Sequence, residues 1–345
     1  MLRRALLAAA DSERVRELLT AAPAASAVVS RYVAGESIQD ALGVARALRS
    51  DGLLVSLDYL GEETTDAQRA AATAAQYLHL LGRLADEGLS DGGAVEVSVK
   101  LTALGLLLPS GERVAAEHLE RIAVAARDAG TTVTVDAEDH PTTDATLRIA
   151  SALRSRLGSA GGGSDGSGAA GGSPNGSRPV GAGPVGGAGP VVGGGLVGSV
   201  VQAALRRTEA DVRELAAPGV RVRLCKGAYA EPLAEAFTAR HDIDRSFARC
   251  LRILMAGPGY PMIATHDPRL IAITRSLGSG RSPDSFEYQM LYGVRPQEQR
   301  RLGASGARVR VYVPYGGDWY RYLVRRLAER PANLALFLRS ISSTS

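Results

Sequence analysis

The stretch VRVRLCKGAYAEP, residues Val220–Pro232, joins an apolar, β-branched run to a lysine, a glycine and a proline. A run of this kind bounded by turn residues is typical of a buried strand. Seven similar runs occur elsewhere, and helical patterns such as Asp66–Glu87, Ala115–Ala129 and Thr208–Leu215 separate most of them. Eight strands that alternate with helices predict a (β/α)8 barrel. The predicted strands are Leu53–Leu57, Val95–Val99, Thr132–Val135, Leu196–Ala203, Val220–Leu224, Pro261–Thr265, Phe286–Leu291 and Val309–Val313.

A doubly wound open sheet is the alternative to a barrel, and it normally carries a nucleotide-binding glycine pattern after its first strand. The segment at that position reads LDYLGEE, residues 57–63, and lacks the pattern. The stretch GAGPVG, Gly181–Gly186, matches the pattern by its letters, but no strand precedes it, no helix follows it and a proline lies inside it. The barrel is therefore the preferred fold.

The chain divides into a helical segment, residues 1–50, and a catalytic barrel, residues 51–345. We expect the helical segment to pack outside the barrel or to form a small cap. A glycine-rich insertion at about 158–195 interrupts the barrel, and its composition cannot bury enough apolar surface to fold, so we expect it to be disordered. The insertion falls between the third helix and the fourth strand, which in a barrel is the face opposite the active site.

Composition and charge exclude several classes of protein. The 40 basic and 36 acidic residues nearly balance, and no basic run is interleaved with aromatic residues, so nucleic-acid binding is not indicated. Cys225 and Cys250 form no disulfide framework, and neither cysteines nor histidines show metal-ligand spacing. The start, MLRRALLAAADSERV, imitates a signal peptide, but Asp11 and Glu13 end its apolar run early, which favours an amphipathic helix. No apolar stretch is long enough to cross a membrane, and we expect a cytoplasmic protein.

Barrel enzymes carry their chemistry at the carboxyl ends of the strands. In this chain those ends hold both of its lysines, Lys100 and Lys226, whereas all other basic residues are arginine. A compact ammonium at both places indicates sites that a planar guanidinium does not serve. Each polar strand-end residue taken alone has a structural explanation, such as a turn or a helix cap, but their gathering at so many strand ends favours a function. These residues are Asp58, Glu62, Lys100, Asp136, Glu138, Gln202, Arg223, Lys226, Thr265, His266, Glu287, Gln289 and Tyr312.

A second concentration of polar and aromatic residues lies in GGDWYRYLVRRLAER, Gly316–Arg330. Arg325 and Arg326 are adjacent in a predicted helix, so their side chains point about 100° apart. On a helix that lies across the mouth they can bind one carboxylate from two sides, because guanidinium groups pair with carboxylates bidentately. Two solvated surface arginines are the commoner outcome of such a doublet, but the neighbouring aromatic residues argue against it.

Together these motifs resemble the proline dehydrogenase family. The matching stretches span residues 56–333 in order, apart from the insertion. The combination of K-G-A-Y, A-T-H and Y-L-V-R-R in this order is specific, whereas any one of them alone is weak. The stretches are SLDYLGEE (56–63), VSVKLTALG (97–105), VTVDAEDH (133–140), VRLCKGAYAEP (222–232), IATHDP (263–268), FEYQMLYGVR (286–295), RVYVPYG (310–316) and YLVRRLAERPAN (322–333).

The resemblance implies a distorted barrel whose last helix carries Arg325 and Arg326 over the mouth, and the length of the chain suggests the stand-alone bacterial form. It implies FAD-dependent oxidation of L-proline to Δ1-pyrroline-5-carboxylate, with electrons passed to a quinone at the inner face of the cell membrane. It also implies a role for individual residues. The substrate carboxylate is bound by Lys100, Arg325 and Arg326, and the pocket for the substrate ring is shaped by Asp136, Tyr312 and Tyr322. The two arginines pair with Glu62 and Asp136. FAD is contacted by Gln202, Arg223, Lys226, Gly227, Ala228, Thr265 and His266, with Glu329 near it.

The chemistry places its own demands on the residues. No side chain accepts a hydride, so the oxidation of an amine requires a cofactor. Arg223 is the candidate for a positive group that stabilises charge arriving on the flavin. Asp136, Tyr312 or water takes the proton from the proline nitrogen. The alternative function is a Schiff-base lyase or aldolase on the same barrel, with Lys100 or Lys226 as its nucleophile; the near balance of charge disfavours a non-catalytic partner of acidic polymers.

Overall fold

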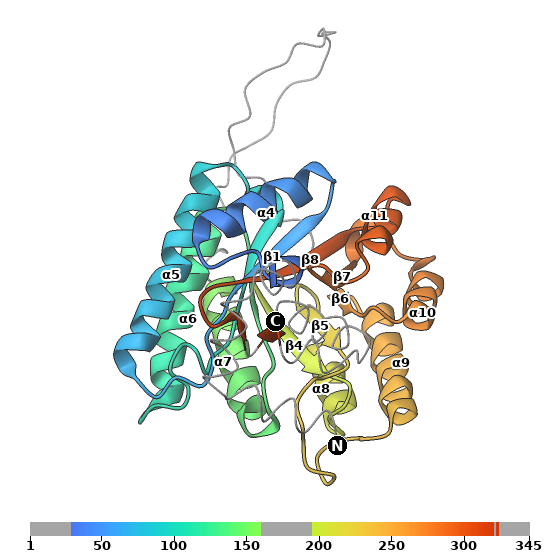
Figure 1. The fold of residues 1–345 in the computed structure, drawn as a ribbon. Coiled ribbons are helices and arrows are strands. Elements are labelled where there is room, and N and C mark those ends of the chain that lie inside the picture. The colour runs from blue at the N-terminus through green and yellow to red at the C-terminus, as the bar shows by residue number, and fades with distance from the viewer. Residues whose placement is uncertain (1–28, 160–194, 321, 324–345) are drawn as a thin grey trace, which may run out of the picture.

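The computed structural model describes residues 29–159, 195–320, 322 and 323, and these contain a closed barrel of eight parallel strands. The strands follow one another around the barrel in chain order, and β8 returns to β1 with Val311 opposite Val55 (Figure 1). The predicted (β/α)8 barrel is confirmed, and each strand end lies within two residues of its expected position. The strands are β1 (Leu54–Tyr59), β2 (Val95–Val99), β3 (Val133–Val135), β4 (Val197–Gln202), β5 (Arg221–Cys225), β6 (Tyr260–Ala264), β7 (Glu287–Leu291) and β8 (Val309–Tyr315).

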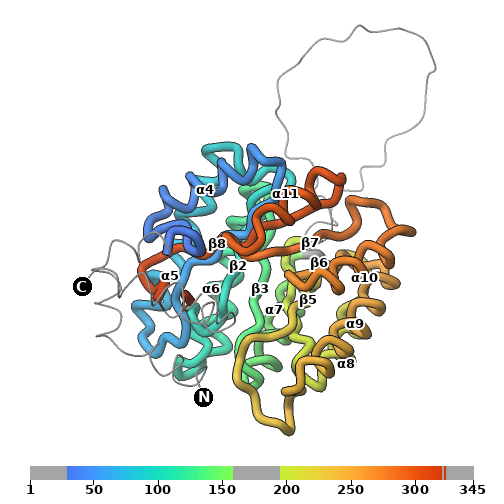
Figure 2. Tube along the Cα trace, turned by 45° about the vertical axis from the view of Figure 1, so that its right-hand side comes forward, coloured from blue at the N-terminus to red at the C-terminus, as the bar shows by residue number. Residues whose placement is uncertain are grey.

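The helices between the strands surround the barrel (Figures 1 and 2). Some of their starts are encoded locally by a capping side chain. Asp66 accepts from Gln68 N–H at 2.8 Å before the helix that begins at Ala67, and Asp267 accepts from Arg269 N–H at 3.0 Å before the helix that begins at Pro268. No helix in the described part of the chain is long and apolar enough to span a membrane. The helices are α5 (Ala67–Asp86), α6 (Gly111–Asp128), α7 (His140–Ser159), α8 (Thr208–Leu215), α9 (Arg240–Ala256), α10 (Pro268–Gly278) and α11 (Pro296–Ala304), with short 3-10 helices at Asp91–Gly93 and Pro283–Ser285.

One further helix, α4 (Ile38–Ser50), precedes β1 and packs on β1 and β8. It lies between α11 and α5, where a regular barrel has the helix that follows its last strand (Figures 1 and 2). Arg46 pairs with Glu87 at the end of α5, and Asp51 pairs with Arg300 of α11 at 2.9 Å. Residues 38–50 therefore pack outside the barrel, which is one of the two places expected for the helical segment; residues 1–28 lie outside the described part.

The strands separate an apolar core from a polar interior. Valines 95, 97 and 99 of β2 belong to the apolar core that the strands share with the helices. The intervening Glu96 contacts Arg221 of β5 and Arg310 of β8, and neither of these strands is a neighbour of β2 in the barrel. Successive side chains along a strand point to opposite faces, so alternate residues face the helices and the residues between them face the barrel axis. Barrel interiors are usually filled by branched apolar side chains, whereas this one holds charged side chains together with serine, threonine and glutamine.

Residues 160–194, which make up most of the expected insertion, lie outside the described residues. Helix α7 continues to Ser159, two residues into the segment that composition assigned to the insertion. The connection runs from the end of a helix to the start of β4, so both of its ends lie at the amino end of the barrel, as expected.

Candidate active site

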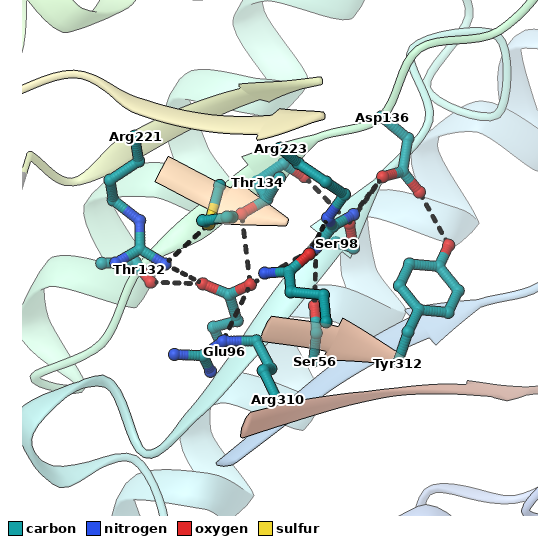
Figure 3. A network of polar contacts seen from close by, with 12 residues as sticks. Ser56, Glu96, Ser98, Thr132, Thr134, Asp136, Arg221, Arg223, Arg310 and Tyr312 are labelled. Carbon is teal, nitrogen blue, oxygen red and sulfur yellow. Dashed lines mark hydrogen bonds and ion pairs between the residues drawn. The ribbon is translucent and has the colours of Figure 1, made fainter. Parts of the chain in front are cut away.

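The deep interior of the barrel holds a buried ion network (Figure 3). Glu96 accepts from Arg221 Nη2 at 2.7 Å and from the Thr132 hydroxyl at 2.7 Å. Arg310 donates to both oxygens of Glu287, at 2.7 and 3.1 Å. Burial alone raises the pKa of Glu287, but Arg310 and Arg221 lower it to about 2, so this carboxylate is ionised at neutral pH.

Arg223 connects this network to the mouth of the barrel. Its Nη1 donates to Asp136 Oδ1 at 2.5 Å and to Ser98 Oγ at 2.8 Å. Its Nε donates to Gln289 Oε1, and its Nη2 donates to Ser56 Oγ at 3.3 Å. All three nitrogens of the guanidinium therefore bind groups from other strands, and the side chain is held in one orientation.

At the mouth, Lys100 lies among acidic side chains. Its Nζ donates to Asp58 Oδ2 at 2.6 Å and to the Tyr312 hydroxyl at 3.3 Å. Asp136 Oδ2 lies 3.7 Å from the ammonium and Glu62 Oε1 lies 3.9 Å from it. Tyr312 in turn donates to Asp136 Oδ2 at 2.7 Å (Figure 3). Three carboxylates thus surround one ammonium.

The protonation states at the mouth follow from burial and from these neighbours. Burial lowers the pKa of Lys100, but Asp58 and Asp136 raise it far above its ordinary value, so Lys100 is a permanent cation. Burial and the Asp136 charge both raise the pKa of Tyr312, so the phenol stays neutral and donates. Burial raises the pKa of Glu138 to about 7, although Thr102 opposes the shift.

The residues expected to contact a cofactor lie at the carboxyl ends of β4, β5 and β6, which are neighbours in the barrel. Gln202, the last residue of β4, donates through Nε2 to the backbone oxygen of Glu138 at 2.6 Å. Lys226 follows β5, and its ammonium pairs with Asp244 at 2.5 Å and Asp267 at 3.2 Å. Its side chain remains 28% exposed, so the ammonium can still meet a bound molecule.

The other four members of this set lie beside them. Gly227 has φ 101°, and a Cβ there would come within 3.1 Å of Gln202 Oε1. Ala228 follows it and is half-buried. Thr265 is buried and accepts from Asp267 N–H at 3.1 Å. His266 accepts through Nε2 from Leu291 N–H at 2.9 Å.

The structure divides the sequence-predicted residues between two arcs of the mouth. Asp58, Lys100, Asp136 and Tyr312 belong to the arc formed by β8, β1, β2 and β3, whereas the cofactor set belongs to the arc of β4, β5 and β6. Arg223 starts in the second arc and reaches Asp136 in the first. Asp58 lies within β1 rather than after it, because β1 extends to Tyr59.

The final predicted elements are only partly described. Tyr322 is buried, with 7% of its surface exposed, a few residues beyond β8. Arg325, Arg326 and Glu329 lie outside the described residues. Their contacts, including the predicted pairing of the two arginines with Glu62 and Asp136, stay predictions.

Sequence reasoning missed the deep network, including Glu96, Arg221, Arg310 and Ser98. The signal was present in VEVSV and RVRL, where a polar residue takes every second position of a strand. That alternation normally indicates a strand with one face in water. In a closed barrel the same polar face turns inward. The alternation can therefore be assigned to the barrel interior only once the sheet is known to close.

Comparisons with known proteins agree with this architecture. The family model "Proline dehydrogenase" matches residues 41–337. "Proline dehydrogenase 1" of Bacillus subtilis (strain 168) is 34% identical over 90% of this chain and 89% of its own length, and "Proline dehydrogenase" of Deinococcus radiodurans is 31% identical over 98% and 97%. The crystal structure of proline utilization A (PutA) from Bdellovibrio bacteriovorus inactivated by N-propargylglycine shares the fold. It has a TM-score of 0.72 and 23% identity, over 88% of this chain and 33% of that longer chain. A family model that matches most of the chain, and relatives above 30% identity along nearly their whole length, show that the chain belongs to the proline dehydrogenase family of oxidoreductases.

Proposed function

We propose that this enzyme oxidises L-proline to Δ1-pyrroline-5-carboxylate with FAD, that a hydride passes to flavin N5, and that the electrons continue to a quinone. The division of the mouth into two arcs is the observation that best supports the proposal. One arc gathers charged groups around Lys100, and the other offers an amide, an ammonium, a hydroxyl and an imidazole. A small zwitterionic amino acid and a large polar cofactor require these two kinds of surface.

The second arc fits a flavin dinucleotide by the chemistry of its groups. The partly exposed ammonium of Lys226 suits phosphate oxygens. Gln202 Oε1 accepts no hydrogen bond from any described residue, so it can receive a ring N–H, and Gly227 keeps a side chain away from it. When bound, the flavin supplies the hydride acceptor that no side chain offers. The residues that would hold it are Gln202, Lys226, Gly227, Ala228, Thr265 and His266.

The charges of the first arc fit an amino acid substrate. Lys100 and Arg223 are the two cations there, and they face three carboxylates. Among the described residues the carboxylates of this arc therefore outnumber the cations, which favours the binding of a further cation. The ammonium of the substrate and the predicted doublet of Arg325 and Arg326 are the candidates. Arg223 acts through its charge, because its nitrogens already donate to the protein.

Tyr312 is a poor acceptor for the amine proton. Its hydroxyl already donates to Asp136, and burial together with the Asp136 charge raises its pKa. We infer that the proton leaves to Asp136 or to water, and that Tyr312 fixes the orientation of Asp136.

The geometry disfavours the alternative of a lysine nucleophile. A lysine forms a Schiff base only as the neutral amine. Asp58 and Asp136 hold the pKa of Lys100 far above its ordinary value, against the effect of burial. Lys226 is already engaged in ion pairs with two carboxylates, those of Asp244 and Asp267.

The test is optical. The purified protein should be yellow, and anaerobic addition of L-proline should bleach its flavin absorbance. D-proline is the matched control, since it presents the same groups with the opposite hand. A colourless protein that borohydride traps covalently with a carbonyl substrate would instead establish the lysine chemistry.

The acceptor and the cellular location rest on the family resemblance alone. We propose a quinone acceptor, met by peripheral contact of a cytoplasmic protein with the inner face of the cell membrane. Turnover with a soluble quinone that exceeds turnover with NAD⁺ supports the first point. Sedimentation of the active protein with vesicles of anionic lipid supports the second, and its absence at low salt contradicts it.

A further inference from the structure

The loop between β1 and α5 brings Glu62 to the mouth and contains a strained residue. Glu63 has φ 54°, in the left-handed region that residues with a Cβ rarely adopt. Its neighbour Glu62 lies 3.9 Å from Lys100 Nζ. A strained residue persists only where the surrounding contacts fix it, and such residues gather at functional sites.

Thr102 supplies those contacts. Its hydroxyl accepts from Glu63 N–H at 3.0 Å, and its backbone oxygen accepts from Thr64 N–H at 3.3 Å. Thr102 is 3% exposed and lies two residues after Lys100. The segment that carries Lys100 therefore also fixes the loop that carries Glu62.

Glu138 fixes Thr102 in turn. It is 3% exposed, and within the described structure its carboxylate forms no ion pair. Its Oε1 accepts from Thr102 N–H at 3.0 Å, and its Oε2 accepts from the Thr102 hydroxyl. In its ionised form the Glu138 carboxylate is an acceptor only, so it draws the single hydroxyl proton of Thr102 toward itself and leaves a lone pair for Glu63 N–H.

We propose that Thr102 and Glu138 are positioning residues, which hold Glu63 in its left-handed conformation and so keep the Glu62 carboxylate beside Lys100. This inference rests on the proposed function, because it assigns Glu62 to the substrate side of the mouth. Without the hydrogen bond from its N–H to the Thr102 hydroxyl, Glu63 relaxes to an ordinary φ, and the adjacent Glu62 turns away from Lys100. The loss falls on substrate binding, because Gln202 of the cofactor arc bonds to the backbone oxygen of Glu138 rather than to its carboxylate, and the deep network keeps its own contacts.

The test replaces Thr102 by valine, which keeps the shape and removes the hydroxyl. Amide hydrogen exchange in the flavin-loaded protein should show the Glu63 amide exchanging about fivefold to tenfold faster, as expected for one lost hydrogen bond. KM for proline should rise about fivefold or more while kcat changes less than about twofold, and flavin content should not change. Thr102→Ser keeps the hydroxyl and should restore both values. Thr146→Val is the matched control, because the buried Thr146 hydroxyl has no partner among the described residues.

Glu138→Gln is the second variant. The side-chain amide of glutamine carries N–H donors, and these can compete with Glu63 N–H for the oxygen of the Thr102 hydroxyl. It should shift exchange and KM in the same direction by a smaller factor. Wild-type exchange and wild-type KM in Thr102→Val would overturn the inference. So would a fall in kcat at constant KM, which would assign the pair to the cofactor side. If exchange responds as expected but proline reduces the flavin in no variant, wild type included, the positioning role of Thr102 and Glu138 stands and the proposed function fails.

Discussion

Replacing Lys100 by methionine should destabilise the fold by about 3–5 kcal/mol at pH 8, the range for removing one partner of a buried ion pair. Methionine keeps the length of the side chain and removes only its charge. Asp58 is fully buried, its Oδ2 lies 2.6 Å from the ammonium, and its Oδ1 has no partner among the described residues. Without Lys100 the Asp58 carboxylate has no cation in contact within the described part of the chain, and the Asp136 carboxylate lies nearby.

The deficit should depend on pH, with a definite sign. In the wild type, burial raises the pKa of Asp58, Lys100 opposes the rise and Asp136 adds to it. Without Lys100 the two raising effects are opposed only by the smaller, lowering effect of Tyr312, so the pKa of Asp58 rises further. A carboxyl whose folded pKa exceeds its unfolded pKa contributes stability at low pH that is lost as pH rises through the folded pKa. The deficit of the variant should therefore be smaller at pH 5 than at pH 8.

Urea unfolding, followed by the fluorescence of the single tryptophan, Trp319, measures both effects. Trp319 is buried and donates to Glu36 at 2.9 Å, so unfolding changes its surroundings. Asp58→Asn and the double variant complete a mutant cycle, in which the double variant should be about 2 kcal/mol more stable than the two single deficits predict. Strict additivity, or a deficit that is equal at the two pH values, would refute the pairing of Lys100 with Asp58.

Three further predictions concern the cofactor arc, the pH dependence of stability and the insertion. Lys226→Ala should lower flavin content while far-UV circular dichroism stays unchanged; Arg269→Ala, which removes a more exposed cation from the same two carboxylates, is its control. The free energy of unfolding of the wild type, measured relative to that of Glu138→Gln, should fall by up to about 3 kcal/mol as pH rises from about 4.5 to 7. Burial raises the pKa of Glu138 to about 7, so over this range the unfolded chain has already lost the proton that the folded protein still holds. A difference that does not change with pH would contradict this. Deletion of residues 160–194 should leave kcat/KM within about twofold, because both ends of the segment lie on the face opposite the mouth; a folded but inactive deletion variant would contradict this placement.

The strands could be predicted from the sequence because each is a local pattern. The run VEVSV predicts a strand with the ends that β2 has in the structure, and it puts Lys100 at the mouth, where the structure has it. Lys226 was likewise placed at the end of its strand. Strand ends at a barrel mouth are fixed by chain order alone once the barrel is recognised, so these positions required no knowledge of side-chain contacts.

The contacts between strands could not be predicted in the same way. Glu96 and Arg221 are separated by more than a hundred residues, and only closure of the sheet brings them to 2.7 Å. The left-handed Glu63 was missed for a related reason. Its conformation is fixed by Thr102, which lies in another loop, and Glu63 is not the glycine that normally marks a positive φ.

The polar interior explains how the mouth keeps its geometry. Arg310, Glu287, Gln289, Arg223 and Asp136 form a continuous chain of hydrogen bonds from the floor of the barrel to the mouth. An apolar interior of equal volume would pack as well, but it would leave the three nitrogens of Arg223 without acceptors, and a buried cation without acceptors is far more costly than a buried methyl group. The polar and charged groups below the mouth are therefore needed because they supply acceptors for the buried guanidinium of Arg223. Because a partly satisfied network is worse than an apolar one, loss of a deep acceptor such as Gln289 should displace Arg223, and through it Asp136, before it unfolds the barrel.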